Sequence, residues 1–435
     1  MKRVLASVAL CAALSLHSAV ARAGGAIDTV ASKAAVSLGP VPQSMFVVAA
    51  PLVSDQPAPK GDALALRVAA VMAGKINASS HAYPKVASLS VARAAAGKMA
   101  GLVYVATQLE KGELRVTADI FPVVANGWDR ARAPAPPPRA HAFAEAPIDA
   151  EVRTFLPALS LEQAQIHKAH HDEGTVLAAA CGDLDGDGGM EIALVSRDRV
   201  AVGHLRGTGE QERFVVSQKV DLAALAARVA VPLREPLAGA AFGDRTLFVA
   251  TSDRGGVELG ADLALRATLA GIPVAGSGRI ECAHVDPSAG SFSGDLHACS
   301  DDANGVTVVA PLPRFDTVAF ADIVDKVGVA RAALAARDLD GKLSVRYGAA
   351  TRSFDDVGAQ TVVADLDLDG VPEIVTTRNA QDDSIQIWSY DGVQTRDRKK
   401  IPAPAGVSAL AVCPPEAGGA PALVAVVGPE IWLLR

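Results

Sequence analysis

Beyond residue 23 the sequence lacks any apolar stretch of roughly 18 residues, the length that a transmembrane helix requires. It also lacks the signatures of several enzyme classes, because neither a Gly-x-Ser-x-Gly nor a His-Glu-x-x-His motif occurs. Basic residues are outnumbered by acids, 41 against 48 in 435 residues. These absences disfavour a membrane-spanning protein, a hydrolase with a standard nucleophile motif and a nucleic-acid-binding protein, which needs a basic surface.

The N-terminal segment has the features of a secretory signal. A basic start is followed by an apolar run to about Leu16 and by a small-residue cleavage pattern at Ala21 and Ala23. We therefore expect residues 1–23 to be removed after Ala23, and the mature protein to be periplasmic, secreted or at the cell surface. The mature chain has 38 basic and 48 acidic side chains, a net charge of −10.

A proline-rich segment divides the mature chain. Residues 125–160 include three consecutive prolines, 136–138, and predict an extended linker. Before the linker, residues 40–124 predict a small α/β domain. Its expected elements are a buried strand at 44–53, helices at 61–76 and 88–100, and a β-hairpin that turns at Lys111 and Gly112.

Residues 161–435 predict a β-propeller. Short apolar strands alternate with turns, and units of three to four strands recur every 40 to 60 residues or so. Five units are convincing. A sixth, around residues 336–348, is weaker because Asp338 lies too close to Asp365 to leave room for a whole blade between them. The fold class is therefore mainly β, with about six blades and a range of five to seven.

Two segments of this region repeat one acidic pattern. "DLDGDGGMEI" from Asp183 and "DLDLDGVPEI" from Asp365 agree at loop positions 1, 3, 5, 6, 9 and 10. Alternate residues of a tight loop converge, and crowded carboxylates repel one another unless a cation lies between them. Oxygen ligands without His or Cys favour Ca²⁺ over transition metals. The predicted ligands, including the carbonyls at position 7, are Asp183, Asp185, Asp187, Gly189 and Glu191, and Asp365, Asp367, Asp369, Val371 and Glu373.

An EF-hand shares the opening spacing but ends in a bidentate glutamate at position 12. Leu194 and Thr376 stand there instead, and the flanking residues predict strands rather than helices. The pattern indicates a calcium loop between two strands. Three related segments have lost acids and are expected to bind calcium poorly or not at all: those after Asp244, around Asp286 and Asp295, and at Asp338.

Both acidic loops resemble the FG-GAP/VCBS repeats of calcium-binding propellers, whose form is D-x-D-x-D-G-x-x-[DE]-[IL]. The resemblance covers roughly residues 175–435 and implies that each loop joins the first two strands of a blade and is held by calcium. The α/β domain followed by a propeller resembles the architecture of TolB-like periplasmic proteins, which implies an envelope-assembly role. Since fold likeness does not fix function, that role is a hypothesis.

Four cysteines remain after processing, which permits two disulfides in an exported protein. Cys282 and Cys299 are expected on consecutive strands of one blade. Cys181 and Cys413 are expected on the innermost strands of the first and last blades, which ring closure makes neighbours. Buried free thiols are an equal alternative.

The sequence favours an exported, non-enzymatic binding or scaffold protein, stabilised by calcium, that engages a protein or glycan of the cell envelope. A propeller-based lyase or hydrolase and a purely structural surface protein are the alternatives. The "HKAHHDE" segment at 167–173 offers histidines that suit zinc, although a solvated polar stretch is the commoner reading.

Overall fold

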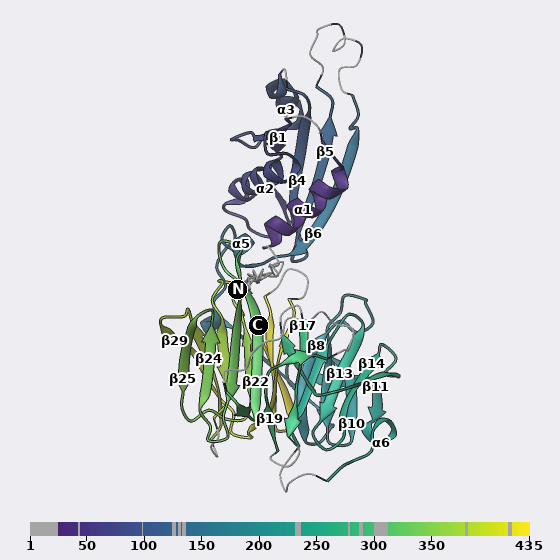
Figure 1. Cartoon of the computed structure of the whole chain (residues 1–435), viewed down its shortest axis with the longest axis vertical. Helices are drawn as coiled ribbons and strands as arrows, with labels where there is room; N and C mark the ends of the chain where they lie inside the picture. Colours follow the sequence, from purple (N-terminus) through teal and green to yellow (C-terminus); the bar gives the residue numbers. More distant parts are fainter. Residues whose placement is uncertain are drawn as a thin grey trace, which may run out of the picture.

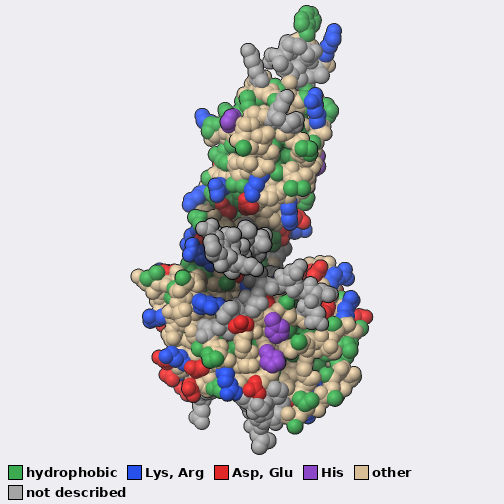
Figure 2. Space-filling view, in the orientation of Figure 1, with side chains coloured by type: hydrophobic (Ala, Val, Ile, Leu, Met, Phe, Trp, Pro, Cys, Tyr) green, Lys and Arg blue, Asp and Glu red, His purple; other side chains and the backbone are tan. Residues whose placement is uncertain are grey.

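The computed structural model describes residues 25–435, apart from 42–43, 98, 124–127, 129–131, 133–135, 231–235, 277–278, 287–289, 300–311, 379–381 and 416–419. The predicted signal segment therefore lies outside the described residues. The chain forms an N-terminal unit, residues 25–156, that stands on one face of a ring of β-sheets (Figure 1). The same two-part outline appears in the space-filling view, where the unit is narrower than the ring (Figure 2). No helix in the described part of the chain is long and apolar enough to span a bilayer.

The N-terminal unit is built on one mixed sheet. Strand β1 (Phe46–Ala49) lies parallel to β4 (Leu102–Glu110), which pairs antiparallel with β5 (Glu113–Phe121). The predicted hairpin at Lys111 and Gly112 is confirmed, with both residues in the left-handed region at φ 54° and 77°. Two short strands also belong to this sheet: β2 (Val53–Ser54), which pairs with β4, and β3 (His81–Ala82), which pairs with β1.

In the described part of this unit, helices cover both faces of the sheet. Helices α1 (Ala26–Leu38) and α2 (Gly61–Ile76) share a core with the side chains of Val103 and Val105. On the opposite face, α3 (Leu89–Ala96) packs near Leu102. Alternate residues of a strand point to opposite faces of its sheet. The apolar residues of β4 therefore lie in the core with α1 and α2 on one face and near α3 on the other.

The N-terminal unit extends further than the predicted 40–124 at both ends. Helix α1 precedes that range and packs against β5 and β6. Within the predicted linker 125–160, residues Ala140–Pro147 form β6, which pairs with β5 from Glu113 to Ile120. The linker prediction was therefore wrong for these residues. Their alternation, "AHAFAEAP", buries the alanines at 142, 144 and 146, a strand signal that the nearby prolines obscured.

The described residues of the ring form six blades, so the predicted propeller is confirmed. Blades 2, 4 and 5 are separate four-stranded antiparallel sheets of consecutive strands. Blade 1 has the same four-stranded antiparallel plan, but the strand β7 (Ile166–His170) joins it to blade 6 in one eight-stranded sheet. Blade 1 has β8 (Val176–Gly182), β9 (Glu191–Ser196), β10 (Arg199–Arg206) and β11 (Arg213–Asp221). Blade 2 has β12 (Ala238–Phe242), β13 (Thr246–Thr251), β14 (Gly255–Gly260) and β15 (Leu265–Leu269). Blade 4 has β22 (Thr317–Val324), β23 (Ala330–Arg337), β24 (Leu343–Tyr347) and β25 (Ala350–Phe354). Blade 5 has β26 (Thr361–Ala364), β27 (Glu373–Thr376), β28 (Ser384–Tyr390) and β29 (Thr395–Pro402).

The other two blades depart from that plan. Blade 3 has β16 (Ile272–Gly276), β17 (Arg279–Ala283) and β20 (His297–Ala298), beside a small sheet of β18 (Val285–Asp286), β19 (Ser291–Ser293) and β21 (Arg314–Phe315). Blade 6 has β30 (Val407–Cys413), β31 (Ala422–Val427), β32 (Glu430–Leu434) and β7 (Ile166–His170), which comes from the start of the propeller sequence.

Strand β7 closes the ring. It precedes blade 1 in the chain yet pairs antiparallel with β32 from Ile166 to His170, so the first strand of the propeller is the outermost strand of its last blade. The innermost strands β8, β12, β16, β22, β26 and β30 touch in that order, and β30 returns to β8. Closure covers the faces of the first and last blades, which an open row of sheets would leave exposed.

The weak sixth unit corresponds to blade 4. The short distance from Asp338 to Asp365 does not exclude a blade, because the segment 338–342 joins β23 to β24, the second and third strands, rather than the first and second. The loop between β22 and β23 carries Asp325, whose Oδ1 accepts hydrogen bonds from the N–H groups of Val327 and Val329 at 3.0 and 2.9 Å. Blade 4 therefore begins about 20 residues earlier than its acidic segment indicated.

Both predicted disulfides are present. Cys181 on β8 is bonded to Cys413 on β30, with Cα atoms 4.8 Å apart. Cys282 on β17 is bonded to Cys299, just after β20, with Cα atoms 4.9 Å apart. The first joins residues 232 positions apart and connects the first blade to the last, whereas the second spans 17 positions within one blade.

Candidate functional site: two acidic loops

The two acidic loops occupy the same place in their blades. The first acidic loop, residues 183–191, joins β8 to β9, and the second, residues 365–373, joins β26 to β27. Each therefore connects the first two strands of a blade. Gly188 and Gly370, at position 6, adopt φ of 85° and 81°, the left-handed turn that the sequence predicted there.

Each loop is held by the same hydrogen bonds to its own backbone. Position 9 accepts a bond from the N–H of position 2: Leu184 to Glu191 Oε2 at 2.7 Å and Leu366 to Glu373 Oε2 at 2.8 Å. Position 1 accepts from the glycine at position 6 at 3.0 and 2.9 Å. These bonds turn the carboxylates inward, and the matching pattern shows that one loop structure is used twice.

Three carboxylates meet in each loop. Oxygen atoms of Asp183, Asp185 and Glu191 lie within 4.8 Å of one another, and so do oxygen atoms of their counterparts Asp365, Asp367 and Glu373. The third aspartates, Asp187 and Asp369, are not part of these groups. Each accepts a hydrogen bond from the N–H two residues ahead, of Gly189 at 2.6 Å and of Val371 at 2.9 Å.

Burial makes these carboxylates costly to ionise. The second loop is the more enclosed, and burial, followed by the charges of Asp369 and Asp367, raises the pKa of Asp365 to about 7. Burial also raises the pKa of Glu373 well above its usual value. In the first loop, burial raises the pKa of Glu191. A cation between the carboxylates would remove this penalty.

Each loop offers one buried oxygen to such a cation. Glu191 Oε1 and Asp367 Oδ1 are fully buried and have no hydrogen-bond partner among the described residues. Their residues are 3% and 4% exposed. Buried polar atoms are nearly always paired, so an unpaired carboxylate oxygen beside two further carboxylates fits a hard divalent ion. The donor set of both loops, all oxygen, fits the predicted calcium.

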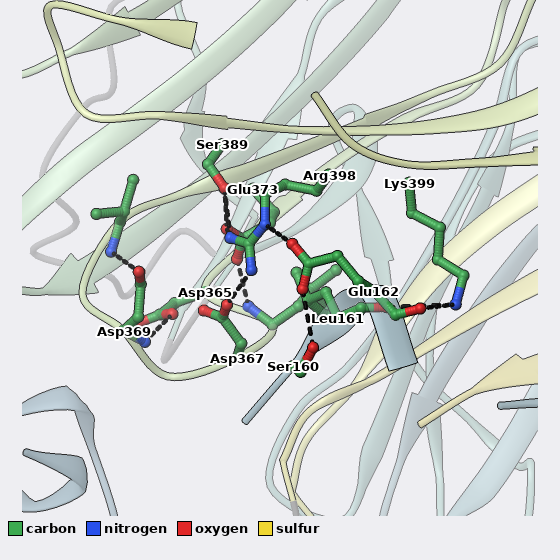
Figure 3. Close-up of polar contacts among 12 residues, drawn as sticks. Ser160, Leu161, Glu162, Asp365, Asp367, Asp369, Glu373, Ser389, Arg398 and Lys399 are labelled. Atoms are coloured by element: carbon green, nitrogen blue, oxygen red, sulfur yellow. Dashed lines mark hydrogen bonds and ion pairs between the residues drawn. The ribbon is translucent and has the colours of Figure 1, made fainter. Parts of the chain in front are cut away.

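The second loop also contains a positive side chain that sequence analysis missed. Arg398 on β29 reaches over the loop, as Figure 3 shows: its Nη2 donates to Asp367 Oδ2 at 2.6 Å, and its Nη1 lies 3.4 Å from Glu373 Oε1. Ser389 donates to the same Glu373 oxygen at 2.8 Å. The Nε of Arg398 donates to Glu162 Oε1 at 2.7 Å, which lowers the pKa of Glu162 to about 2.

The first loop has no such arginine at the corresponding position. Arg398 is the extra residue of a β-bulge between β28 and β29, and the same bulge between β10 and β11 contains Ser217. Ser217 donates to the carbonyl of Val202 at 3.0 Å. In the place of Ser389 stands His204, whose Nε2 lies 3.4 Å from Glu191 Oε1. No sequence motif predicted Arg398 or His204. Arg398 is placed by the bulge of the fourth strand, and His204 is placed by the pairing of β10 with β9.

The other polar segments form no comparable cluster among the described residues. Asp338 uses its Oδ1 to accept from the N–H groups of Asp340 and Lys342, at 3.0 and 2.9 Å. The histidine-rich segment lies on and after strand β7 rather than on a helix. His171 is buried, and its Nε2 lies 3.1 Å from the carbonyl oxygen of Gly428. This contact fits a structural role at the closing strand.

Comparison with known proteins gives a likeness of fold alone. No family model and no curated protein matches the chain. Among solved structures, U3-55K is 12% identical over 74% of this chain and 92% of its own, with a TM-score of 0.36. BBS1N in complex with ARL6DN is 12% identical over 62% and 95%, with a TM-score of 0.34. BamB from Moraxella catarrhalis is 11% identical over 75% and 82%, with a TM-score of 0.30. At these scores, the assignment as a propeller rests on the chain's own sheets.

Proposed function

We propose that the protein is an exported scaffold whose six-bladed propeller is stabilised by calcium in two loops and engages a protein or glycan of the cell envelope. The observation that carries the calcium part is the pair of matching loops, each with three converging carboxylates and one buried oxygen that accepts no hydrogen bond from the described residues. Calcium supplies charge neutralisation, and the loops supply oriented oxygen ligands. The proposed ligands remain the ten residues predicted from the sequence, including the carbonyls of Gly189 and Val371.

Calorimetric titration with CaCl2 and thermal melting with and without EGTA test the calcium part. We expect two bound ions per chain and a melting temperature that falls on chelation, because an ion that binds only the folded state stabilises it. Absence of uptake, together with an unchanged melting temperature, contradicts the proposal. N-terminal sequencing of the exported protein tests the localisation, with Gly24 as the expected first residue.

The scaffold role is supported by a central cavity of about 1530 Å³ lined by the innermost strands. The charged side chains of Arg279 and Asp322 line it, together with the carboxylate of Asp149 from the N-terminal unit. A cavity that joins both parts of the molecule suits a bound peptide or sugar chain. We expect the wild type to retain a partner from envelope extract, and the loop variant D365N/D367N to lose it.

The same cavity provides a place for a substrate in the alternative function, a propeller-based lyase or hydrolase. A screen of polysaccharides for cleavage distinguishes the two functions. Turnover that disappears when a carboxylate of the cavity, such as Asp322, is replaced by asparagine supports the enzyme. Retention of an uncleaved partner supports the scaffold.

A further inference from the structure

The segment that leads into the closing strand is attached to the second acidic loop. Residues 160–164 include the short helix η1 (Leu161–Gln163) and lie just before β7. The ammonium of Lys399 donates to three of their carbonyls, those of Leu161, Glu162 and Ala164, at 3.3, 3.1 and 2.7 Å. The neighbouring Arg398 holds the side chain of Glu162 (Figure 3). Two adjacent cations of β29 thus bind this segment to blade 5.

The other end of the Arg398 guanidinium lies in the loop itself. It bonds Asp367 Oδ2 and the hydroxyl of Ser389, and approaches Glu373. With Oδ2 held in this way, the buried Oδ1 of Asp367 has no partner among the described residues. Asp367 also lines a cavity of about 170 Å³ together with Leu161 and Ala164 of residues 160–164, which we call the entry segment. The oxygen without a partner therefore belongs to Asp367, which is connected to the entry segment through Arg398.

We propose that Arg398 is a positioning residue that couples cation binding in the second acidic loop to the docking of residues 160–164, and so to closure of the ring. The inference rests on the proposed calcium binding and adds its regulation. Arg398 orients Asp367 so that Oδ1 is available to the ion, and the ion fixes the carboxylate that holds Arg398. Because coupling between two binding events is reciprocal, calcium strengthens docking, and docking strengthens calcium binding.

The charges of the site permit both cations at once. The four acids of the loop, together with Glu162 on the other side of Arg398, contribute −5. A calcium ion, Arg398 and Lys326, whose Nζ lies 4.0 Å from Asp369 Oδ2, contribute +4, so the site has a net charge of −1 with both cations in place. A purely electrostatic account nevertheless predicts that removing the arginine tightens calcium binding, since a like charge disappears. Positioning predicts the opposite sign, and this difference makes the proposal testable.

The first experiment measures calcium affinity by titration with CaCl2, in a D183N/D185N background that removes the first loop. We expect R398Q to bind calcium about 10-fold more weakly, the usual effect of removing a group that orients a metal ligand. R398K, which keeps the charge but not the planar fork, is expected to bind weakly as well. Unchanged or tighter calcium binding by R398Q overturns the proposal. Wild-type calcium affinity in R398K also overturns it, because it would show that only the positive charge of the side chain matters.

The second experiment measures hydrogen exchange of residues 160–170 with CaCl2 and with EGTA. Calcium is expected to slow exchange there in the D183N/D185N background, and E162Q is expected to abolish that response. The Glu162 side chain is 50% exposed, so E162Q is expected to fold. Strand β13 of blade 2 serves as the internal control and should exchange equally in both variants. A calcium response that persists in E162Q overturns the coupling.

The calcium proposal and the coupling proposal predict different failures in these experiments. If the parent D183N/D185N chain takes up no calcium, both the calcium proposal for this loop and the coupling are wrong. If it takes up calcium but R398Q and E162Q bind and exchange like their parent, only the coupling is wrong.

Discussion

The two acidic loops share one backbone design but differ in what surrounds them. In blade 1 the loop is open: Asp185 is exposed, and a serine occupies the bulge of the fourth strand. In blade 5 the loop is enclosed, and Arg398 lies over it. Each loop also lies next to a different interaction that closes the ring. Cys181, just before the first loop, is bonded to Cys413, whereas the second loop is connected to the entry segment by hydrogen bonds. The motif fixes the loop's geometry, and the blade around it fixes its electrostatics.

Removing the covalent closure beside the first loop is expected to have the largest effect. Loop-closure entropy for 232 residues predicts that C181A/C413A loses about 5 kcal/mol of unfolding free energy. The comparison pair C282A/C299A closes only 17 residues and is expected to lose about 3 kcal/mol. Urea denaturation of both variants at saturating calcium measures the difference. Equal losses would show that strain or residual structure, rather than chain entropy, dominates.

The pH dependence of the calcium-free protein should expose the burial of the second loop. Asp365 has its pKa raised from 3.8 to about 7 in the folded state, so the folded protein binds the proton more tightly than the unfolded chain. The contribution of this group is fully present below pH 4 and is lost as the pH rises to 7. The shift corresponds to a loss on the order of 4 kcal/mol.

Urea denaturation in EDTA between pH 4 and pH 8 measures this effect. D365N is expected to make the pH profile shallower, and the raised pKa of Glu373 accounts for the dependence that remains. Asp183, at the same position in the open first loop, provides the control variant D183N, which should leave most of the pH dependence in place. A profile that is equally steep in D365N would assign the effect to other groups.

Calcium addition should separate the two loops by stoichiometry. Each occupied site is expected to stabilise the folded state by about 2.7 kcal/mol when free calcium is 100 times the dissociation constant. D183N/D185N and D365N/D367N should each bind one ion fewer and lose one such increment, measured by titration and by melting in CaCl2. If one of the double variants still binds two calcium ions, the loop that it alters does not bind calcium.

Much of this architecture was predictable because its signals are local. The hairpin at Lys111 and Gly112 follows from turn chemistry, and the two loops follow from the spacing of acids within nine residues. The disulfide between Cys181 and Cys413 was predictable as well, because ring closure makes the first and last blades neighbours once the propeller is inferred.

The remaining features depend on contacts between distant segments. Arg398 meets Glu162 across 236 positions, and nothing in either neighbourhood indicates the pairing. Strand β6 was missed because the prolines before it suggested an extended linker, although pairing with β5 determines its structure. Blade 4 was placed too late in the chain since its acidic turn lies between its second and third strands. In each case tertiary pairing overrode a local pattern.

The smallest expected effect compares the glycines at position 6. Both have positive φ, so alanine is strained at either place by about 1 to 2 kcal/mol. A Cβ at Gly188 would meet no atom within 4 Å, whereas a Cβ at Gly370 would lie 3.0 Å from the Cα of Asp325 and from the backbone nitrogen of Lys326 in blade 4. We therefore expect G370A to be more destabilising than G188A by roughly 1 to 2 kcal/mol, the usual cost of overpacking against backbone. Urea denaturation at saturating calcium measures the unfolding free energy of the two variants. Equal losses would mean that the backbone at Asp325 and Lys326 moves aside easily, so that the second loop is less enclosed than these contacts indicate.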